Sequence, residues 1–341
     1  MYSIGLDISK KSISVHIPLN SLDLEIENSK KGLKSFYSKL KKLYKKELDK
    51  IVFVYEPTGS YSTLITKFCA LKNIKAFIIN PKQSSNFAKA LGYRSKSDKI
   101  DAKMLSLSIS IAKESEIKVP IINKTAEDIK ELMSYYMFTL KQRVAVQNHH
   151  EALRVKEGNS YALKDLKKRV KELKIKEEEI IQKIDEIINE DEELLNSYNN
   201  IKTIPGIGTI TAIVLLHLFI KYPKANQKQI VSLVGLDPVI KESGTSVNTK
   251  PKISKSGSRL YRGVLFMATM VSIKFNNQMK DFYARLKANG KHSTVAQIAV
   301  MRKLVVIAHS LYKNDSQYNA EVYQRACGVN KSKSENIEVF V

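Results

Sequence analysis

The first part of the chain alternates hydrophobic and polar positions in a way that predicts three antiparallel strands. Residues 2–7 (YSIGLD) are rich in β-forming side chains, and residues 12–17 (SISVHI) alternate with a period of two. Residues 22–28 (LDLEIEN) alternate again after a short connection. The chain is therefore expected to open as a hairpin that a third short strand extends.

The pattern then changes to helices that alternate with strands. Residues 29–46 and 61–73 carry apolar side chains at helical spacing, whereas residues 51–59 form a buried-type strand that ends in a Pro/Gly turn. Residues 75–81 give one more strand, followed by a helix that holds residues 96–105 (KSDKIDAKML). This order predicts a mixed α/β sheet with helices on both faces, as in a ribonuclease H-like fold.

A heptad repeat follows and predicts a long helix that pairs with another helix. Its a and d positions are Leu163, Leu166, Val170, Leu173, Glu177, Ile180, Ile184, Ile187, Asp191, Leu194 and Tyr198. Glu177 and Asp191 are expected to weaken this seam and to set its register. The partner helix is either the preceding one, near residues 125–155, or the same segment of a second subunit. We expect the second arrangement, and with it a dimer or tetramer.

After Asn200 the chain becomes strongly apolar and helical, so the C-terminal domain is expected to be mostly α-helical. The Pro-Gly-Ile-Gly turn at residues 205–208 lies between two such runs, which is typical of a helix-hairpin-helix element. Backbone N–H groups near Gly206 and Gly208 are suited to binding a phosphate without reading sequence. A plain tight turn explains the motif almost as well. Residues 234–258 are interpreted as a loop rich in Ser, Gly and Lys.

The charge of the chain indicates a polyanionic partner. Its 341 residues include 57 Lys and Arg against 34 Asp and Glu, a formal net charge of +23. Residues 202–303 hold 17 basic and only 3 acidic side chains, whereas residues 157–198 hold 8 basic and 12 acidic. Nucleic acid is therefore expected to bind the C-terminal third. The candidate contacts are Gly206, Gly208, Lys241, Lys250, Lys252, Lys255, Arg259 and Arg262.

The remaining composition points to a soluble cytoplasmic protein. Cys69 and Cys327 lack the spacing of a zinc site and are interpreted as thiols of a reducing compartment. The N-terminus enters a strand pattern at once, and no apolar run reaches about 18 residues. We therefore expect no export signal and no contact with a membrane.

Four acids fall at positions that suggest a metal site. Asp7 ends the first strand, Glu56 ends the strand at residues 51–55, and these strands are neighbours in a ribonuclease H-like sheet. Asp98 and Asp101 lie on one face of a helix, in its first turn. Each acid alone has an ordinary explanation, such as stabilising a helix dipole. Together, four carboxylates call for cations, and two Mg²⁺ or Mn²⁺ ions about 4 Å apart would support phosphoryl transfer.

Several motifs together resemble a known family. GLDISKKSISVHI, YEPTGSY and KSDKIDAKML precede the heptad segment, and IPGIGTITA, VGLDP and ISKSGSRLYR follow it. In this order they resemble the DEDD-type insertion-sequence transposases, also described as bridge-RNA-guided recombinases, over about residues 2–310. The resemblance implies a RuvC-like metal domain (1–122), a helical coiled coil (123–200) and a C-terminal transposase domain (201–315), followed by a tail (316–341).

The resemblance also implies roles for particular residues. The four acids of the RuvC-like site fall on Asp7, Glu56, Asp98 and Asp101. The family's nucleophilic serine falls on Ser243, and it is understood to form a covalent link to DNA beside the acids of another subunit. A structured noncoding RNA, which pairs with donor and target DNA, is the implied partner. Tyr261 and Ser258 depart from the family pattern, which leaves the contacts of their helix open.

Two other functions are compatible with parts of this pattern. The first is a RuvC-type nuclease that hydrolyses DNA junctions through metal-bound water and has no covalent intermediate. The second is a nucleic-acid-binding protein whose acids are only structural, although a binder of polyanions gains nothing from four clustered carboxylates. Ser243 and a dependence on RNA separate the recombinase from the nuclease, because without the resemblance Ser243 is an ordinary turn residue.

Overall fold

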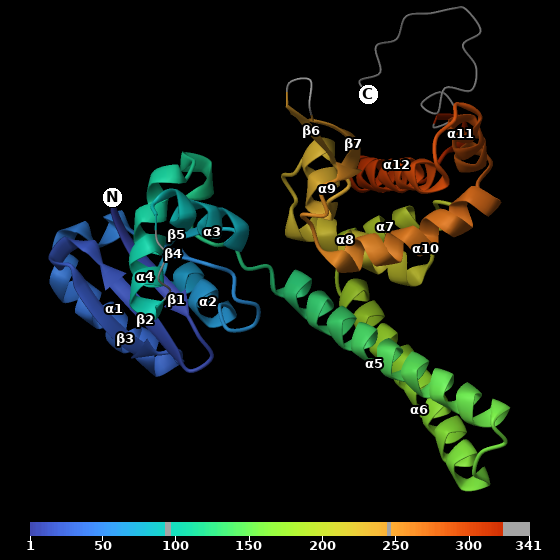
Figure 1. Cartoon of the computed structure of the whole chain (residues 1–341), viewed down its shortest axis with the longest axis horizontal. Helices are drawn as coiled ribbons and strands as arrows, with labels where there is room; N and C mark the ends of the chain where they lie inside the picture. Colours follow the sequence, from blue (N-terminus) through green and yellow to red (C-terminus); the bar gives the residue numbers. More distant parts are fainter. Residues whose placement is uncertain (93–96, 244–246, 323–341) are drawn as a thin grey trace, which may run out of the picture. The chain divides into compact units, whose positions relative to one another are not determined.

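The structure is a computed structural model of the chain, and it describes residues 1–92, 97–243 and 247–322. At residues 241–243 and 247–250 the description is limited to the backbone. The chain divides into two compact units, Met1–Ile122 and Asn123–Val341. Figure 1 shows the first unit in blue and teal and the second in green to red. Each unit is described by itself below.

A five-stranded mixed sheet forms the centre of the first unit. Its strands are β1 (Tyr2–Ile8), β2 (Ser12–Ile17), β3 (Leu22–Glu27), β4 (Ile51–Tyr55) and β5 (Lys75–Ile78), in the spatial order β3-β2-β1-β4-β5. Strand β1 is antiparallel to β2 and parallel to β4, and β5 is parallel to β4. The order and directions are those expected from the sequence, with β1 and β4 as neighbours.

Helices cover both faces of this sheet, and β4 is therefore buried along its whole length. On one face α1 (Lys30–Tyr44) and α2 (Thr63–Lys72) bury Phe36 and Ile65 against odd-numbered residues of β4 such as Phe53. On the other face Met104 and Leu105 of α4 (Asp98–Leu107) pack on the even-numbered residues Val52 and Val54. The alternation of the strands therefore separates an α1/α2 face from an α4 face.

The sequence pattern missed one helix of this unit. Strand β5 was expected to lead directly to the helix that carries Asp98, but α3 (Pro81–Ala90) lies between them. The signal is local, because Asn80 accepts a hydrogen bond from the backbone N–H of Lys82 and Pro81 occupies the first turn. Short 3-10 helices complete the unit: η1 (Pro18–Asn20), η2 (Lys45–Lys50), η3 (Ser108–Ile111) and η4 (Glu114–Glu116).

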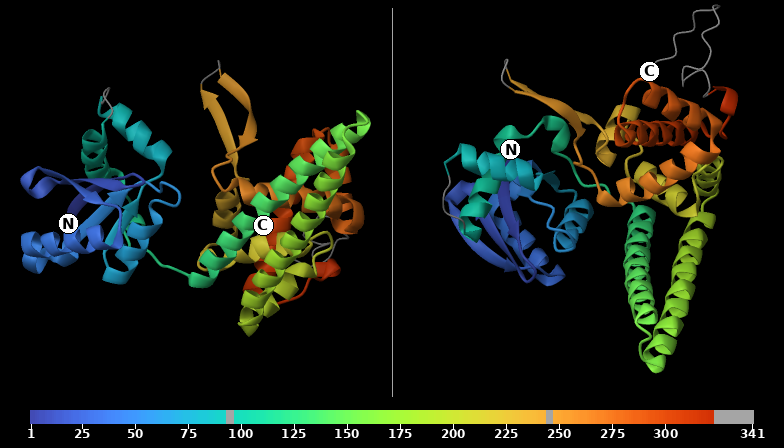
Figure 2. Two further views of the ribbon diagram at one scale, coloured as in Figure 1. Left: turned by 90° about the horizontal axis from the view of Figure 1, so that it is seen from below. Right: turned by 45° about the vertical axis from the view of Figure 1, so that its right-hand side comes forward.

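The second unit begins with a helical hairpin. Helix α5 (Lys124–Val155) and helix α6 (Ser160–Asn189) are joined by four residues and lie side by side (Figures 1 and 2). Ile180 and Ile184 of the heptad repeat are buried, and α5 of the same chain packs against the α6 stripe. The partner is thus the preceding helix, one of the two alternatives left open by the sequence. The apolar heptad positions of α6 are therefore no evidence for an oligomer.

The prediction of an uninterrupted helix through residue 198 is wrong. Helix α6 ends at Asn189, and Asp191 caps α7 (Glu192–Lys202) by accepting a hydrogen bond from the backbone N–H of Leu194 at 3.2 Å. Asp191 is therefore not a core position. An aspartate followed by two glutamates is a favourable start for a helix, and this local preference outweighs the heptad pattern.

A bundle of five further helices follows, built around α8 (Thr209–Lys221), which is buried on all sides. The others are α9 (Gln227–Val234), α10 (Arg259–Phe275), α11 (Asn277–Ala288) and α12 (Ser293–Asn314). Helix α12 is long and apolar enough to span a membrane, but Val300 and Leu304 are fully buried in the core of this unit. Packing accounts for its composition.

The expected loop at residues 234–258 contains a β-hairpin instead. Strands β6 (Pro238–Ser243) and β7 (Val247–Ile253) pair antiparallel and extend from the helical bundle (Figure 2). The apolar residues Val239, Ile240 and Val247 lie among polar ones in this segment, and its many Ser, Gly and Lys residues hid the strand signal.

Candidate active site

The register of β1 and β4 brings Asp7 and Glu56 next to each other. The two strands are parallel, and their last paired residues are Leu6 and Tyr55. Asp7 and Glu56 are the next residue of each chain segment, so their Cα atoms are separated by about the distance between neighbouring strands, roughly 5 Å. Asp7 shares a face with Gly5, and Glu56 shares a face with Val54. Both carboxylates therefore project on the α4 face of the sheet.

Helix α4 packs directly on β1 at Gly5. A Cβ atom there would lie 1.9 Å from the carbonyl oxygen of Ala102 and 2.6 Å from the backbone nitrogen of Ser106. Asp101 precedes Ala102, and Asp7 lies two residues after Gly5 on the same face of the sheet. The contact between α4 and β1 thus places Asp101 on the element that covers the strand ends carrying Asp7 and Glu56.

The four acids differ in how far the structure buries them. Asp7, Glu56 and Asp101 are half-buried, whereas Asp98 is exposed at the start of α4. The Ser97 side chain caps this helix by accepting a hydrogen bond from the backbone N–H of Ile100, so both aspartates lie in its first turn as expected. Among residues 1–92, 97–243 and 247–322, no three acidic, His or Cys side chains are close enough to hold a metal ion.

Asn28 connects the two loops that follow Asp7 and Glu56. Its side-chain amide donates to the carbonyl oxygen of Ser9 at 2.9 Å and to that of Tyr61 at 3.1 Å. Its backbone N–H donates to the carbonyl of Lys11 at 2.9 Å. Asn28 carries no functional signal in the sequence, because an asparagine at the end of a strand is ordinarily a turn residue. Only the sheet order shows that it lies between these loops.

Two buried polar atoms near these loops have no hydrogen-bond partner among the described residues. They are the side-chain carbonyl oxygen of Asn28 and the hydroxyl of Thr58. Thr58 belongs to the turn directly after Glu56, and its own carbonyl accepts from the backbone N–H of Tyr61 at 3.2 Å. Buried polar atoms ordinarily have partners, so this end of the sheet has capacity to bind a polar ligand or water.

The acidic residues offer the type of ligand atom that a hard divalent cation binds. Carboxylate oxygens are the ligands that magnesium and manganese prefer, and Asp7 and Glu56 present them side by side. Like charges at that distance repel in a half-buried site, which favours the binding of a cation between them. Asp101 and Asp98 would complete the ligand set from the first turn of α4.

Comparison with known proteins identifies the family. Residues 198–284 match the family described as Transposase IS116/IS110/IS902, and residues 4–154 match the DEDD-type transposase domain of the same group. The chain belongs to this transposase family. Pilin gene-inverting proteins are similar over 80% of the chain and 83% of their own length: that of Moraxella bovis is 26% identical, and that of Moraxella lacunata 29%. The transposase is thus an enzyme that cuts and rejoins DNA.

Ser243, the expected nucleophile, is the last residue of β6 in this transposase. Its backbone pairs with Val247 across the hairpin, and Lys241 pairs with Thr249. The side chains of Ser243, Lys241 and Lys250 lie outside the described residues, as do Gly244 and Ser246. Ser243 belongs to the second unit and the four acids to the first.

The basic residues selected in the C-terminal unit of the transposase have different environments. Lys252, Lys255 and Arg259 are exposed. Arg262 is half-buried, and its guanidinium donates to the carbonyl oxygens of Val234 at 2.9 Å and Gly257 at 2.7 Å. Arg262 therefore holds the end of α9 against the loop that precedes α10, which gives it a structural role.

The two glycines of the Pro-Gly-Ile-Gly turn also differ. A Cβ atom on Gly206, whose φ is +99°, would lie 2.1 Å from the Ser272 hydroxyl, and that hydroxyl donates to the carbonyl of Pro205 at 3.0 Å. Close packing on α10 therefore explains Gly206. Gly208 is exposed at the N-cap of α8, where a Cβ would meet no described atom within 4 Å. Gly208 is therefore the more accessible of the two to a phosphate.

Cys69 has no part in this site. Cys69 lies on the buried face of α2, and burial raises the pKa of its thiol to about 12, so it is not a reactive thiolate at neutral pH. Cys327 lies outside the described residues.

Proposed function

We propose that this transposase is a recombinase that moves an insertion sequence under the guidance of a noncoding RNA. It would use magnesium held by Asp7, Glu56, Asp98 and Asp101, and Ser243 as a nucleophile that links covalently to DNA. The proposal treats residues 123–200 as a helical segment, residues 201–315 as the transposase domain and residues 316–341 as a tail. It includes a dimer or tetramer, since the family is understood to combine the serine of one subunit with the acids of another.

The observation that carries the proposal is the adjacent position of Asp7 and Glu56 on the α4 face. Two half-buried carboxylates at neighbouring strand ends repel each other, and a cation bound between them removes this repulsion. A protein that only bound DNA would place lysine or arginine there, because carboxylates repel phosphates. The arrangement supports a site whose acids hold cations against a phosphodiester.

Magnesium bound by these acids would supply charge stabilisation to the phosphate under attack. The residues themselves perform the remaining tasks. Asp7 and Glu56 are fixed by the sheet register, and Asn28 holds the adjacent loops in place. Asp98 and Asp101 lie on a separate helix, α4. The geometry of the ligand set therefore depends on how α4 packs on β1.

Ser243 would exchange one phosphoester for another. Its hydroxyl oxygen forms a bond to phosphorus, the bond from phosphorus to one DNA oxygen breaks, and that oxygen leaves as a hydroxyl. The serine proton passes to an acceptor near the site, since a serine hydroxyl needs a base or a cation to become nucleophilic. No external energy is required because the number of phosphoester bonds is unchanged, so the reverse step can rejoin the DNA. The names of the Moraxella relatives, which describe gene inversion, agree with such strand exchange.

The partners follow from charge and from the family. A net charge of +23 favours binding to polyanions, and the exposed residues Lys252, Lys255 and Arg259 are candidate phosphate contacts. Pairing between a guide RNA and DNA would supply the sequence specificity, as in other RNA-guided enzymes. The enzyme would act in the cytoplasm, where the element's DNA is accessible.

The test is a plasmid recombination assay combined with sequencing of the nucleic acid that co-purifies with the protein. The proposal predicts one enriched structured RNA encoded beside the element, and recombination that stops when this RNA is omitted. Recombination by the protein and magnesium alone would contradict RNA guidance. Cleavage of DNA junctions without a protein–DNA adduct would favour the RuvC-type nuclease instead.

A further inference from the structure

The side chains between α5 and α6 become more polar with distance from the helical bundle. Near the helical bundle, Ile129 and Met133 of α5 are buried against α6. Further from the bundle, polar residues of α5 alternate with half-buried apolar ones: Arg143, Gln147 and His150 lie among Val146 and Leu153, whereas α6 continues with leucine and valine. Polar side chains at a helix seam resist complete burial, so this part of the seam stays partly open to solvent.

Arg143 is satisfied within the hairpin, but the next turns of α5 are not. The Arg143 guanidinium donates to Glu177 at 2.6 Å and to Gln147 at 2.8 Å. His150 and Arg154 follow Gln147 at helical spacing on the same face of α5. Their side chains make no hydrogen bond or ion pair with the described residues, nor does that of Lys167 on α6.

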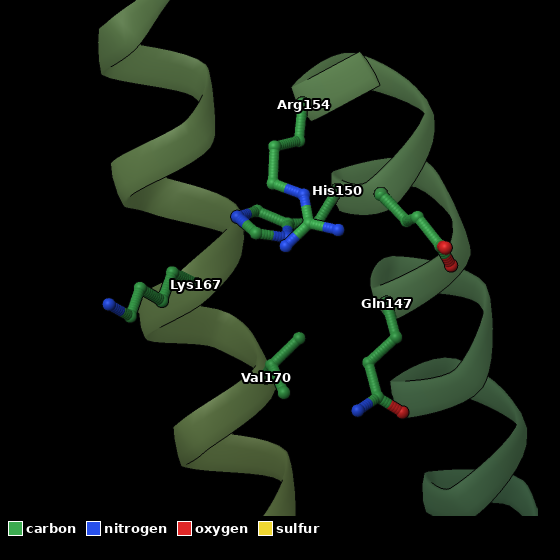
Figure 3. A pocket seen from close by; sticks show the side chains of 6 residues that line it. Gln147, His150, Arg154, Lys167 and Val170 are labelled. Carbon is green, nitrogen blue, oxygen red and sulfur yellow. The ribbon is translucent and has the colours of Figure 1, made fainter.

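These side chains line a cleft between the two helices. Figure 3 shows Gln147, His150 and Arg154 along α5, with Lys167 and Val170 on the facing part of α6. The cleft has a volume of about 410 Å³, and Glu151 is the one acid in its lining. Val170 is its single apolar side chain, so the lining suits an anion better than an apolar ligand.

The charges of the whole hairpin are segregated in the same direction. Residues 141–176, which form its tip, hold 11 basic and 4 acidic side chains. Residues 177–193, which lead back to the bundle, hold 1 basic and 9 acidic. The excess of acids counted over residues 157–198 therefore hid a strongly basic tip, because it averaged two segments of opposite sign.

We propose that the tip of the α5–α6 hairpin binds the phosphodiester backbone of nucleic acid, with Arg154, Lys167 and His150 as the phosphate-contacting residues. The inference rests on the proposed function for its partner. It adds a second electrostatic contact to the one expected in the C-terminal unit. The unpaired cations Arg154 and Lys167 repel each other across the cleft, and a bound phosphate removes that repulsion while it releases counterions from the nucleic acid. Arginine and lysine at this site position the backbone and do not read bases.

The experiment compares two double variants of the full chain with equal charge. The test variant is Arg154→Gln/Lys167→Gln. The control is Lys124→Gln/Lys183→Gln, which also removes one exposed cation from α5 and one from α6 but lies outside the tip. Affinity for a fluorescein-labelled DNA duplex and for a labelled RNA hairpin is measured by anisotropy over a series of NaCl concentrations. Unfolding curves confirm that both variants are folded.

The proposal predicts that the test variant flattens the slope of log K against log salt by up to about two units, roughly one per lost phosphate contact, whereas the control leaves it unchanged. A change with DNA alone or RNA alone supports the proposal and identifies the source of the phosphates. Equal slopes for both variants with both probes overturn the proposal. If the slopes are unchanged and the assembly mass measured by light scattering falls in the test variant, the tip is a protein contact, which also overturns it. The result is independent of recombination, so an inactive but DNA-binding wild type would refute the proposed function and leave this test valid.

Discussion

A Cβ atom on Gly5 would lie 1.9 Å from the carbonyl oxygen of Ala102, so a side chain at position 5 is incompatible with the contact between β1 and α4. This contact couples two parts of the candidate site. Asp7 follows Gly5 on the same face of the strand, and Asp101 precedes Ala102 on the helix. The helix that carries Asp101 therefore packs on the strand that carries Asp7 through a main-chain contact that only glycine permits.

Gly5→Ala should displace α4 and lower both stability and activity. Overpacking of a close contact costs about 1–3 kcal/mol, which should lower the unfolding temperature of the first unit by at least about 5 °C. Gly263→Ala is the control, since Gly263 lies inside α10 and a Cβ there meets no described atom within 4 Å. Alanine is a better helix former, so this variant should be as stable as wild type or more so. A Gly5→Ala protein with wild-type unfolding temperature and recombination would contradict the role of the contact.

Asn28→Ala should impair recombination more than it impairs folding. The variant loses two hydrogen bonds that connect the loops after Asp7 and Glu56, a cost of about 1–3 kcal/mol. Because the loops hold the strand ends in register, we expect activity to fall at least tenfold and its half-saturating magnesium concentration to rise. Asn28→Asp keeps the size but removes the amide donors, so it should behave like the alanine variant. An unchanged magnesium dependence in both would mean that Asn28 is only structural.

The Arg143–Glu177 pair offers a test of the hairpin seam. The two side chains are 19% and 11% exposed, and Nε donates to the carboxylate at 2.6 Å. Glu177→Ala should destabilise the second unit by about 2–4 kcal/mol, because it leaves a guanidinium without its partner. Replacing both residues, as in Arg143→Met/Glu177→Leu, should restore most of this loss. Additive effects in a double-mutant cycle measured by urea unfolding would show that the pair is not coupled.

Two buried histidines should make the second unit sensitive to acid. His217 is 4% exposed, and burial, with smaller contributions from Lys221 and Lys130, lowers its pKa to about 4. Burial, with a smaller contribution from Lys313, also lowers the pKa of His309. A folded-state pKa below the unfolded value of about 6.5 means that the unfolded chain binds the proton first. The stabilisation is therefore complete above about pH 6.5 and is lost as the pH falls towards 4, by up to about 3 kcal/mol for His217.

Urea unfolding at pH 7.5, 6 and 5 measures this loss. In His217→Gln/His309→Gln the decline of stability between pH 7.5 and 5 should be much smaller than in wild type, whatever the absolute stability of the variant. Parallel pH profiles for the two proteins would show that other groups cause the acid sensitivity.

The sequence predicted the parts of the site that depend on period and topology. Asp7 and Glu56 could be placed because each ends a clear strand and the order of elements implies that these strands are neighbours. Asn28 could not, since its role depends on two loops that are distant in the sequence. Local interactions caused the other errors: an N-cap at Asp191 interrupts the heptad helix, and Arg262 binds carbonyl oxygens that no periodic pattern reveals.

The distribution of charge depends on the fold for a different reason. Counting acids and bases over residues 157–198 assumed that the segment was one helix with one environment. In the hairpin its two halves lie at opposite ends, so the sum has no physical meaning. Charge counts become informative only when the fold shows which residues share a surface.

The most direct test of the account is the detection of a covalent protein–DNA adduct under denaturing conditions. Wild type with its RNA, labelled donor DNA and magnesium should yield an adduct, and chelation of the metal should abolish it. Ser243→Ala and Asp7→Asn should each yield none while binding RNA and DNA as wild type does, the first because the nucleophile is missing and the second because a metal ligand is replaced at nearly constant shape. Glu56→Gln, Asp98→Asn and Asp101→Asn should behave like Asp7→Asn. An adduct formed by Ser243→Ala, or full recombination by Asp7→Asn, would contradict the account.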